Sequence, residues 1–536
     1  MRKSIALSLA VAGIAVWLTA QALSPSDSKS AMDLMPPGAL VYLEARNFNQ
    51  LLSGWNGSPE KKAWLDSANY QVFLPSHLII RMTEARKAYL EAASLPESAP
   101  LLDALAGGES AIALYNIGKI EFLYTTKLNA GQFAGSALAG ARSKFETRKA
   151  GNYNYFIRTQ GDSAIAYALV NERLFLAMRE DLIAAALKLL SGQPGTPLSK
   201  ESWFADALKN APTGPADLKV VTDLAHVAKT PQFRSYWIQR NVTELGQYAS
   251  SIVHVTIANG SIKEDRVLLR QKEAPAEADD LGDVLRYVPA DTGFYQAVSK
   301  PSPESVTALL KDRLFGSGAP IGATASTIAP AAPDSGTIGG EDDFETRVDL
   351  TVETTPHGED VFAPLAAIAA NTDAVLQAGA SKLENDQVMV GVSMALVLRG
   401  KEPWKLADVQ RDLGTVAKTM WAADAWPGNQ LKVEGNILIL GTSASILATA
   451  TAKPQESQQG RYIAEYRHAQ ELPMFERITK MIDFPSIPQG TDTREPLFFS
   501  ENIASLARVF ARLDSISITE RDTGAAVQQT AVYKLK

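Results

Sequence analysis

The sequence predicts an α+β protein in which one unit occurs twice, each copy a mainly antiparallel sheet packed by helices. Segments that alternate like strands are separated by helix-like stretches, and each half ends in a strand pair around a tight turn. Four segments of the first half also recur in the same order in the second half. The 536 residues exceed one ordinary core, which fits two domains or one duplicated domain.

The N-terminal segment has the composition of an export signal. Arg2 and Lys3 precede an apolar run that ends at Ala20, and Ala20-Gln21-Ala22 fits a small-x-small cleavage site. The run is close to the roughly 20 residues of a membrane span, so a cleaved signal and an uncleaved anchor both stay open. In either case we expect the rest of the chain outside the cytoplasm, periplasmic or tethered to the inner membrane.

The predicted boundaries follow from composition. The charged, apolar-poor stretch from Lys272 to Asp280 suits a connection between the halves. Residues 316–343 are rich in Gly, Ala, Pro, Ser and Thr, which indicates a flexible low-complexity insertion rather than a lid. The predicted division is 1–22 signal peptide or membrane anchor, 23–31 linker, 32–275 first α+β repeat and 276–536 second α+β repeat.

The prediction of a repeat depends on four pairs of segments. They are Pro37–Ala45 with Pro289–Ala297, Leu174–Ala184 with Leu438–Ala448, Asp223–Phe233 with Glu465–Phe475, and the hairpins around Asn259-Gly260 and Asp522–Gly524. The first pair is strand-like and begins with Pro. In the second pair, a strand is followed by a helix that Asp181 or Ser445 could cap. A continuous sheet across both halves is a further expectation.

Composition excludes several kinds of function. The net charge of −7, without a dense basic cluster, argues against a nucleic-acid partner. The chain has no cysteine, which excludes disulfides, thiolate metal sites and a Cys nucleophile. Sequence motifs of the common hydrolases, nucleotide-binding proteins and metalloproteases are absent, so we expect no cofactor and no metal, and a non-enzymatic protein is favoured over an enzyme.

The repeated acidic-x-x-His is the best candidate for site chemistry. It occurs as Asp223 with His226 and as Glu465 with His468. A carboxylate that accepts an imidazole N–H orients the ring in acid–base and metal sites. Two copies could meet at the interface between the repeats, whereas the structural interpretation is a strand-to-helix junction repeated by descent.

Trp55 and Trp64 are a second candidate, as aromatic residues of a binding platform near a loop. The structural alternative is that they plug a helix against the sheet. Between them, Ser58-x-x-Lys61 matches a nucleophile motif of acyl-transfer enzymes, but its partner motifs are missing. Ser58 is equally explained as a helix cap that is followed by Pro59 at the first helical position.

Two stretches carry a resemblance to known sequences. Gly38 to Phe73, with Trp55 and Trp64, resembles the start of uncharacterised exported bacterial proteins of domain-of-unknown-function type, and Pro496 to Leu535 is similar to their end. Some of these families are associated with α2-macroglobulin-like protease traps of the cell envelope. The resemblance implies an envelope partner of that kind and provides no catalytic residue.

The leading functional prediction is a non-enzymatic exported envelope protein, a binding, scaffold or accessory module for an envelope protein or membrane component. One alternative is a hydrolase whose site would lie between the repeats and use His226 and His468. A second alternative is a carrier of a hydrophobic ligand, since a cavity can open between a sheet and its helices.

Overall fold

The computed structural model describes residues 29–67, 70, 74, 77–98, 104–161, 163–231, 245–277, 279–290, 292–315, 360–383, 390–421, 426–453, 457–472 and 511–536. The predicted signal or anchor at 1–22 and the predicted insertion at 316–343 therefore lie outside the described residues. Within the described ranges, no helix is both long and apolar enough to cross a membrane.

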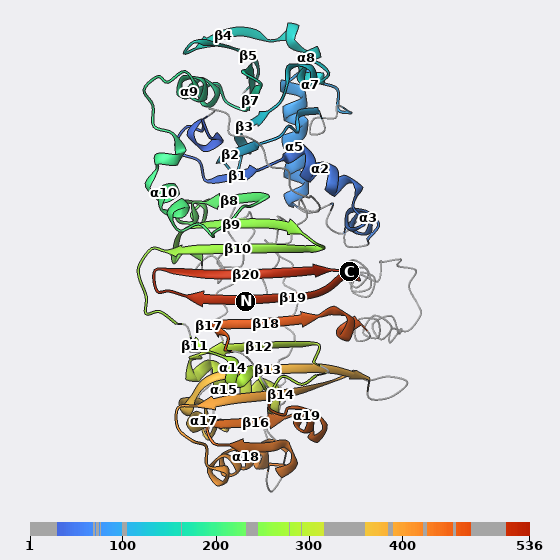
Figure 1. Cartoon of the computed structure of the whole chain (residues 1–536), viewed down its shortest axis with the longest axis vertical. Helices are drawn as coiled ribbons and strands as arrows, with labels where there is room; N and C mark the ends of the chain where they lie inside the picture. Colours follow the sequence, from blue (N-terminus) through green and yellow to red (C-terminus); the bar gives the residue numbers. More distant parts are fainter. Residues whose placement is uncertain are drawn as a thin grey trace, which may run out of the picture.

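The chain is α+β, and its main feature is one sheet of 18 strands that runs through both halves (Figure 1). Every neighbouring pair is antiparallel, and the order across the sheet is β4-β5-β6-β7-β3-β2-β1-β8-β9-β10-β20-β19-β18-β12-β13-β14-β16-β15. The predicted α+β class, with antiparallel pairing and a sheet continuous across both halves, is confirmed.

The strand bounds show where the halves meet. Strands of the first half are β1 (Val41–Ala45), β2 (Ser110–Asn116), β3 (Glu121–Lys127), β4 (Glu146–Ala150), β5 (Tyr153–Gln160), β6 (Ser163–Val170), β7 (Arg173–Ala177), β8 (Leu218–Thr222), β9 (Tyr248–Ala258) and β10 (Ser261–Arg270). Strands of the second half are β12 (Phe294–Ser299), β13 (Thr372–Leu383), β14 (Val390–Gly400), β15 (Leu431–Glu434), β16 (Ile437–Gly441), β18 (Tyr462–Arg467), β19 (Leu513–Asp522) and β20 (Ala526–Leu535). The two halves join where β10 pairs with β20.

Both predicted hairpins are present at this joint. Asn259 and Gly260 connect β9 to β10 with positive φ values of 52° and 70°, as a two-residue turn between twisted strands requires. At the other hairpin, the Asp522 side chain accepts a hydrogen bond from the backbone N–H of Gly524, whose φ is +83°. Local turn chemistry therefore fixes the register of both central strand pairs.

Helices cover both faces of the sheet at each end. On one face these are α9 (Glu180–Leu190), α10 (Ser202–Lys209), α14 (Gly282–Leu285) and α19 (Ala444–Thr449). On the other face they are α2 (Phe48–Gly57), α5 (His77–Ala92), α8 (Ala137–Gly140), α15 (Pro303–Leu310), α17 (Leu365–Asn371) and α18 (Leu406–Trp421). The strands at the ends are therefore apolar on both faces, as doubly covered strands should be.

The predicted cap residues of two of these helices are wrong by two positions. The N-cap of α9 is Arg179, and Asp181 lies in the first turn, where the helix dipole favours a carboxylate. The N-cap of α19 is Ser443, whose hydroxyl accepts from the backbone N–H of Ile446, and not Ser445. The predicted order of strand and then helix is correct at both sites.

Candidate functional site

One row of side chains shows how the sheet changes character along its length. Directly opposed residues of antiparallel strands point to the same face, so the register identifies every member of a row. The row is polar from β1 to β19 and apolar from β18 to β16, and its other end at β7, β3 and β2 has one polar residue between two apolar ones. It runs Phe175, Thr125, Ala111, Glu44, Lys219, His254, Asp265, Thr530, Thr519, Ile463, Ala297, Leu376, Val397 and Ile439.

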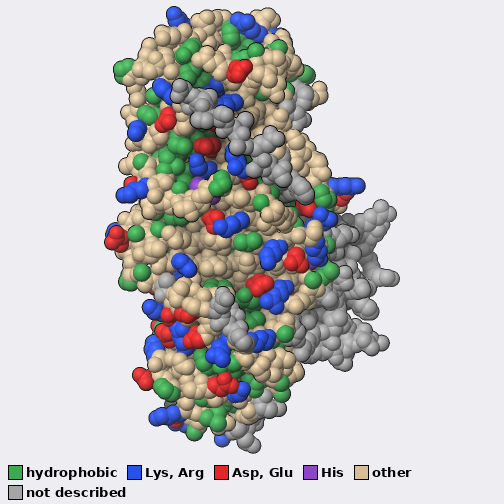
Figure 2. Space-filling view, in the orientation of Figure 1, with side chains coloured by type: hydrophobic (Ala, Val, Ile, Leu, Met, Phe, Trp, Pro, Cys, Tyr) green, Lys and Arg blue, Asp and Glu red, His purple; other side chains and the backbone are tan. Residues whose placement is uncertain are grey.

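We call this face of β8, β9, β10, β20, β19, β18 and β12 the polar middle face. It lies between the helices of the two ends, and Figure 2 shows charged side chains of both signs dispersed over it. Not every residue on it is polar, because Val221, Ile252 and Val267 belong to the core that includes α10. The more polar part is therefore the portion from His254 towards the opposite ends of these strands, although Val532 also lies on it.

The polar middle face is positively charged on a chain whose net charge is negative. Its cationic side chains are Lys219, Lys263, Arg467, Arg521 and Lys534, against the carboxylates of Asp265 and Glu465. Lys263, Arg521 and Lys534 are exposed. Because the whole chain carries −7, this concentration of cations favours an anionic partner for this face.

Hydrogen bonds and ion pairs hold the polar row in place across the joint of the two halves. The Thr530 hydroxyl donates to Asp265 at 2.7 Å, linking β20 to β10, and Lys263 lies 2.9 Å from the same carboxylate. His254 next to them is 8% exposed, and its Nε2 is buried without a hydrogen-bond partner. Burial and the neighbouring Lys219 lower the pKa of His254, which keeps the imidazole neutral.

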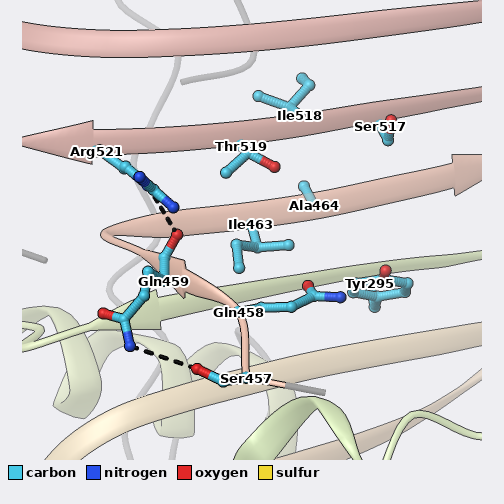
Figure 3. A pocket seen from close by; sticks show the side chains of 10 residues that line it. All are labelled: Tyr295, Ser457, Gln458, Gln459, Ile463, Ala464, Ser517, Ile518, Thr519 and Arg521. Atoms are coloured by element: carbon cyan, nitrogen blue, oxygen red, sulfur yellow. Dashed lines mark hydrogen bonds between the residues drawn. The ribbon is translucent and has the colours of Figure 1, made fainter. Parts of the chain in front are cut away.

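A shallow hollow of about 400 Å³ opens on the polar middle face above β12, β18 and β19 (Figure 3). Its floor includes Ile463 and Thr519, and Tyr295 lies at one side. Its wall is the segment 457–459, which leads into the short strand β17 (Gln459–Gly460). There the Gln459 side chain donates to the Ser457 hydroxyl and the Gln459 carbonyl accepts from Arg521. Hydroxyl, amide and guanidinium groups therefore line this hollow together with the apolar residues Ile463 and Ile518.

A second hollow of about 190 Å³ shares Tyr295 with the first. Arg286, Lys453 and Arg467 line it, together with apolar residues of the segment from Leu285 to Ala290. Lys453 is positioned by donating to the Val288 carbonyl at 2.9 Å. The lining of neither hollow includes Asp or Glu, and this one has three cationic side chains whereas the larger has Arg521 alone, so it is the more cationic of the two.

Glu465 lies beside the second hollow and fixes its two polar neighbours. It accepts hydrogen bonds from the Tyr295 hydroxyl at 2.9 Å and from Arg467 at 3.1 Å. Burial would raise the pKa of Glu465, but the hydrogen bonds from Arg467 and Tyr295 outweigh it and lower the pKa below its usual value. The ionised carboxylate is therefore a positioning group for Tyr295 and Arg467.

The two acidic-x-x-His segments have different local structures. Asp223 is the N-cap of α11 (Leu224–Val227), and its carboxylate lies 2.6 Å from Nδ1 of His226, whose side chain is 67% exposed. Glu465 is instead part of β18, and His468 is completely buried just after that strand. The first pair is a capping interaction on the surface, and the second places the histidine in the interior.

The structure does not bring these segments together. Four strands separate β8 from β18, which is roughly 24 Å at about 4.8 Å per strand. The two segments also lie at opposite ends of their strands. Following paired residues across the sheet from Thr222 leads to Asp522, at one end of β19, whereas Arg467 pairs with Ser515, near the other end of β19. An active site shared by His226 and His468 has no geometric support.

If the two halves were copies of one fold, the sequence match between these segments would be offset by three residues. Val41 pairs with Thr222, and the Gly293 carbonyl accepts from the Arg467 backbone N–H. If Val41 corresponds to Gly293, as in the first predicted pair, Asp223 corresponds to His468 and not to Glu465. In that alignment Asp223 and Glu465 would occupy different positions in the two junctions.

Trp55 and Trp64 lie on consecutive helices, α2 and α3 (Pro59–Leu65), and both are half-buried. The ring of Trp64 meets Tyr70 edge-on, with centroids 6.0 Å apart. Between the helices, the Ser58 hydroxyl accepts from the Lys61 backbone N–H at 3.0 Å, while the Lys61 ammonium donates to Asn56. Ser58 is therefore a cap, and its side chain has no general base in Lys61.

The residues that define the two hollows were missed by sequence reasoning. Tyr295 lies in a segment that had been recognised as a strand, but alternation does not show which face of a strand is left uncovered. Arg286 and Lys453 come from chain segments 167 residues apart in sequence, so no local pattern joins them. In the described part of the chain, no three His, Asp or Glu side chains are close enough to hold a metal ion.

Comparisons with known proteins add little to this geometry. No family of known proteins matches the chain, and no curated protein does. Six solved chains match, among them crystal forms I and III of TP0453, at 9% and 8% identity and a TM-score of 0.24 in both cases. The two alignments cover 46% and 47% of this chain and 82% and 83% of TP0453, and a TM-score this low carries no argument about fold or function.

Proposed function

We propose that this chain is an exported, non-enzymatic envelope protein that binds a partner on the polar middle face. The observation that carries the proposal is the change in character along the sheet. Helices bury both faces at the two ends, while the middle carries Lys263, Arg521, Lys534 and hydroxyl side chains towards solvent. Among the described residues no helix covers this polar part of the long sheet, which suits a rigid recognition surface.

Recruitment of a partner strand at a sheet edge is less favoured than binding on this face. The outer strands, β4 and β15, have only five and four residues and carry Glu146, Arg148, Lys149, Lys432 and Glu434. Short, charged edge strands are the usual protection against pairing with another chain. The strands of the polar middle face have neighbours on both sides, so a partner there must be recognised through side chains.

We also propose that the two halves are copies of one fold. Outward from the joint, the strands follow in the order β10-β9-β8-β1-β2-β3-β7 in one direction and β20-β19-β18-β12-β13-β14-β16 in the other. Each half reaches these positions in the same succession along the chain. A duplication explains this, with β4, β5 and one further helix-rich segment as additions to the first copy.

The alternatives have less support. A hydrolase that uses His226 and His468 together would need these residues in one pocket, and they lie on different parts of the sheet. A carrier of hydrophobic ligands would need an enclosed apolar cavity, whereas the larger hollow is open and mixes polar with apolar residues, and the smaller one is lined by three cationic side chains.

The proposal is tested by chemical cross-linking and co-purification of the full chain, with its own N-terminus, from envelope membranes. Lys263→Glu combined with Arg521→Glu should remove a partner that the unchanged protein retains, because both cations are exposed on the polar middle face. Lys209→Glu at the exposed end of α10 is the matched control. Recovery of the same partners with the double variant and with the unchanged protein would contradict the proposal. The partner that the sequence resemblance suggests is an α2-macroglobulin-like protein.

A further inference from the structure

The two hollows on the polar middle face form one composite surface around Tyr295. The larger hollow, of about 400 Å³, and the smaller one, of about 190 Å³, both include this residue in their lining. The Tyr295 hydroxyl is held by Glu465, so the ring between the hollows is fixed in orientation. A ligand that occupies both hollows would pass across an immobilised aromatic ring.

The larger hollow has the chemistry that suits a sugar. Ser517, Thr519, Gln458 and Gln459 each offer both donors and acceptors, and hydroxyl-rich ligands require both. The hollow is open and shallow rather than deep and apolar, which fits a polymer that lies along the surface. The Tyr295 ring has an apolar face and a polar hydroxyl end, and it therefore also complements a sugar ring.

The smaller hollow has the chemistry that suits a carboxylate. Arg286, Lys453 and Arg467 supply the charge, and the planar guanidinium group matches a carboxylate with two parallel hydrogen bonds. Glu465 already neutralises part of the charge of Arg467, so the remaining excess fits one negative charge rather than a cluster of them.

We propose that this composite surface binds an acidic oligosaccharide, with sugar hydroxyls in the larger hollow and a sugar carboxylate in the smaller one. The inference depends on the proposed binding function of the polar middle face and specifies its ligand. An acidic peptide is the less favoured ligand, because an extended peptide gains most of its affinity by pairing with a free strand edge, and β12, β18 and β19 are paired on both sides.

The test is calorimetric titration of the full chain, at low salt, with oligogalacturonate of six to eight units. Maltohexaose is the neutral sugar of similar length, and hexaglutamate is the acidic peptide. We expect binding of oligogalacturonate only. Arg286→Gln should weaken it about tenfold, the effect of losing one charge-assisted hydrogen bond. Arg286 is exposed, so the fold should be unaffected, and Lys209→Met serves as the control variant.

Three outcomes would overturn the inference: equal binding of maltohexaose, preferential binding of hexaglutamate, or unchanged affinity in the Arg286→Gln variant.

The inference and the proposed function can fail separately. If no oligosaccharide binds but Lys263→Glu with Arg521→Glu still removes a co-purifying partner, the ligand assignment is wrong and the binding face stands. If that partner is also retained by the double variant, both are wrong.

Discussion

Asp522 is the most heavily engaged carboxylate at the joint of the two halves. It is 2% exposed, forms an ion pair with Arg270 of β10, and lies 2.9 Å from Arg461. Its second oxygen accepts the Gly524 backbone N–H. A buried carboxylate with two cations and a backbone donor stabilises the fold only while all of its partners are present.

Replacing Arg270 by Gln should therefore destabilise the protein by about 3 kcal/mol, because it leaves the buried Asp522 without its closest cation. Burial opposes ionisation of Asp522, but Arg270 and the Gly524 N–H lower the pKa below its usual value of 3.8. The stabilisation is thus present above that pH and is lost as the pH falls through the lowered pKa. Urea denaturation at pH 7 and pH 3 measures both effects.

The matched control for this variant is Arg411→Gln on α18. Arg411 forms ion pairs with Asp408 and Asp412 but is exposed, so its removal should leave the free energy of unfolding nearly unchanged. Equal stability losses in the two variants would show that the Asp522 cluster does not stabilise the joint.

His254 should make stability depend on pH in a different range. Burial, reinforced by Lys219, lowers its pKa below 6.5 in the folded protein. As the pH falls through about 6.5, the unfolded chain takes up this proton before the folded chain does, and the free energy of unfolding decreases. His254→Gln should reduce the loss of stability between pH 7.5 and pH 5.5, measured by urea denaturation. A loss as large as that of the unchanged protein would contradict this assignment.

At the scale of single elements, the best predictions from sequence came from turns. Asn259-Gly260 specifies a two-residue hairpin because both positions need a positive φ, and β9 and β10 pair in that register. Strand β14 gave no comparable signal. Its sequence is largely apolar, because helices cover both faces, and such runs cannot be told from buried helix by periodicity.

The edge strand β4 illustrates how the sheet is ended. Its five residues are Glu146, Thr147, Arg148, Lys149 and Ala150, and all but Ala150 are exposed. Replacing Glu146 and Lys149 by Val should expose a pairing-competent edge and cause concentration-dependent self-association, measured by light scattering during size-exclusion chromatography.

Lys263→Val is the control for this prediction, since it makes an equally exposed strand position apolar on β10, which is paired on both sides. If the double β4 variant stays in the association state of the unchanged protein, or Lys263→Val associates equally, the charges on β4 are not what protects the edge.

At the scale of the whole molecule, the sequence predicted that one sheet continues across both halves, and it did not predict where the sheet is left bare. The continuous sheet could be predicted because the hairpins and the repeated order of segments are visible in the sequence as local or pairwise signals. The second depends on which helices cover which strands, and the polar middle face arises only after α10 and α14 are placed on either side of it. For the same reason Asp223 and His226 were selected by spacing, while Tyr295 and Arg286 were not.

Both the binding surface and the Asp522 cluster exist only if β10 and β20 pair in the register described. The chain contains no cysteine, so one engineered pair reports this pairing without background. Asp265 and Thr530 are directly opposed, with their side chains 2.7 Å apart. Asp265→Cys with Thr530→Cys should form a disulfide on mild oxidation, detected by altered gel mobility that thiols reverse. Glu264→Cys with Thr530→Cys, which places the thiols on opposite faces, should stay reduced. Failure of the first pair to cross-link, or equal cross-linking of both pairs, would contradict the single sheet.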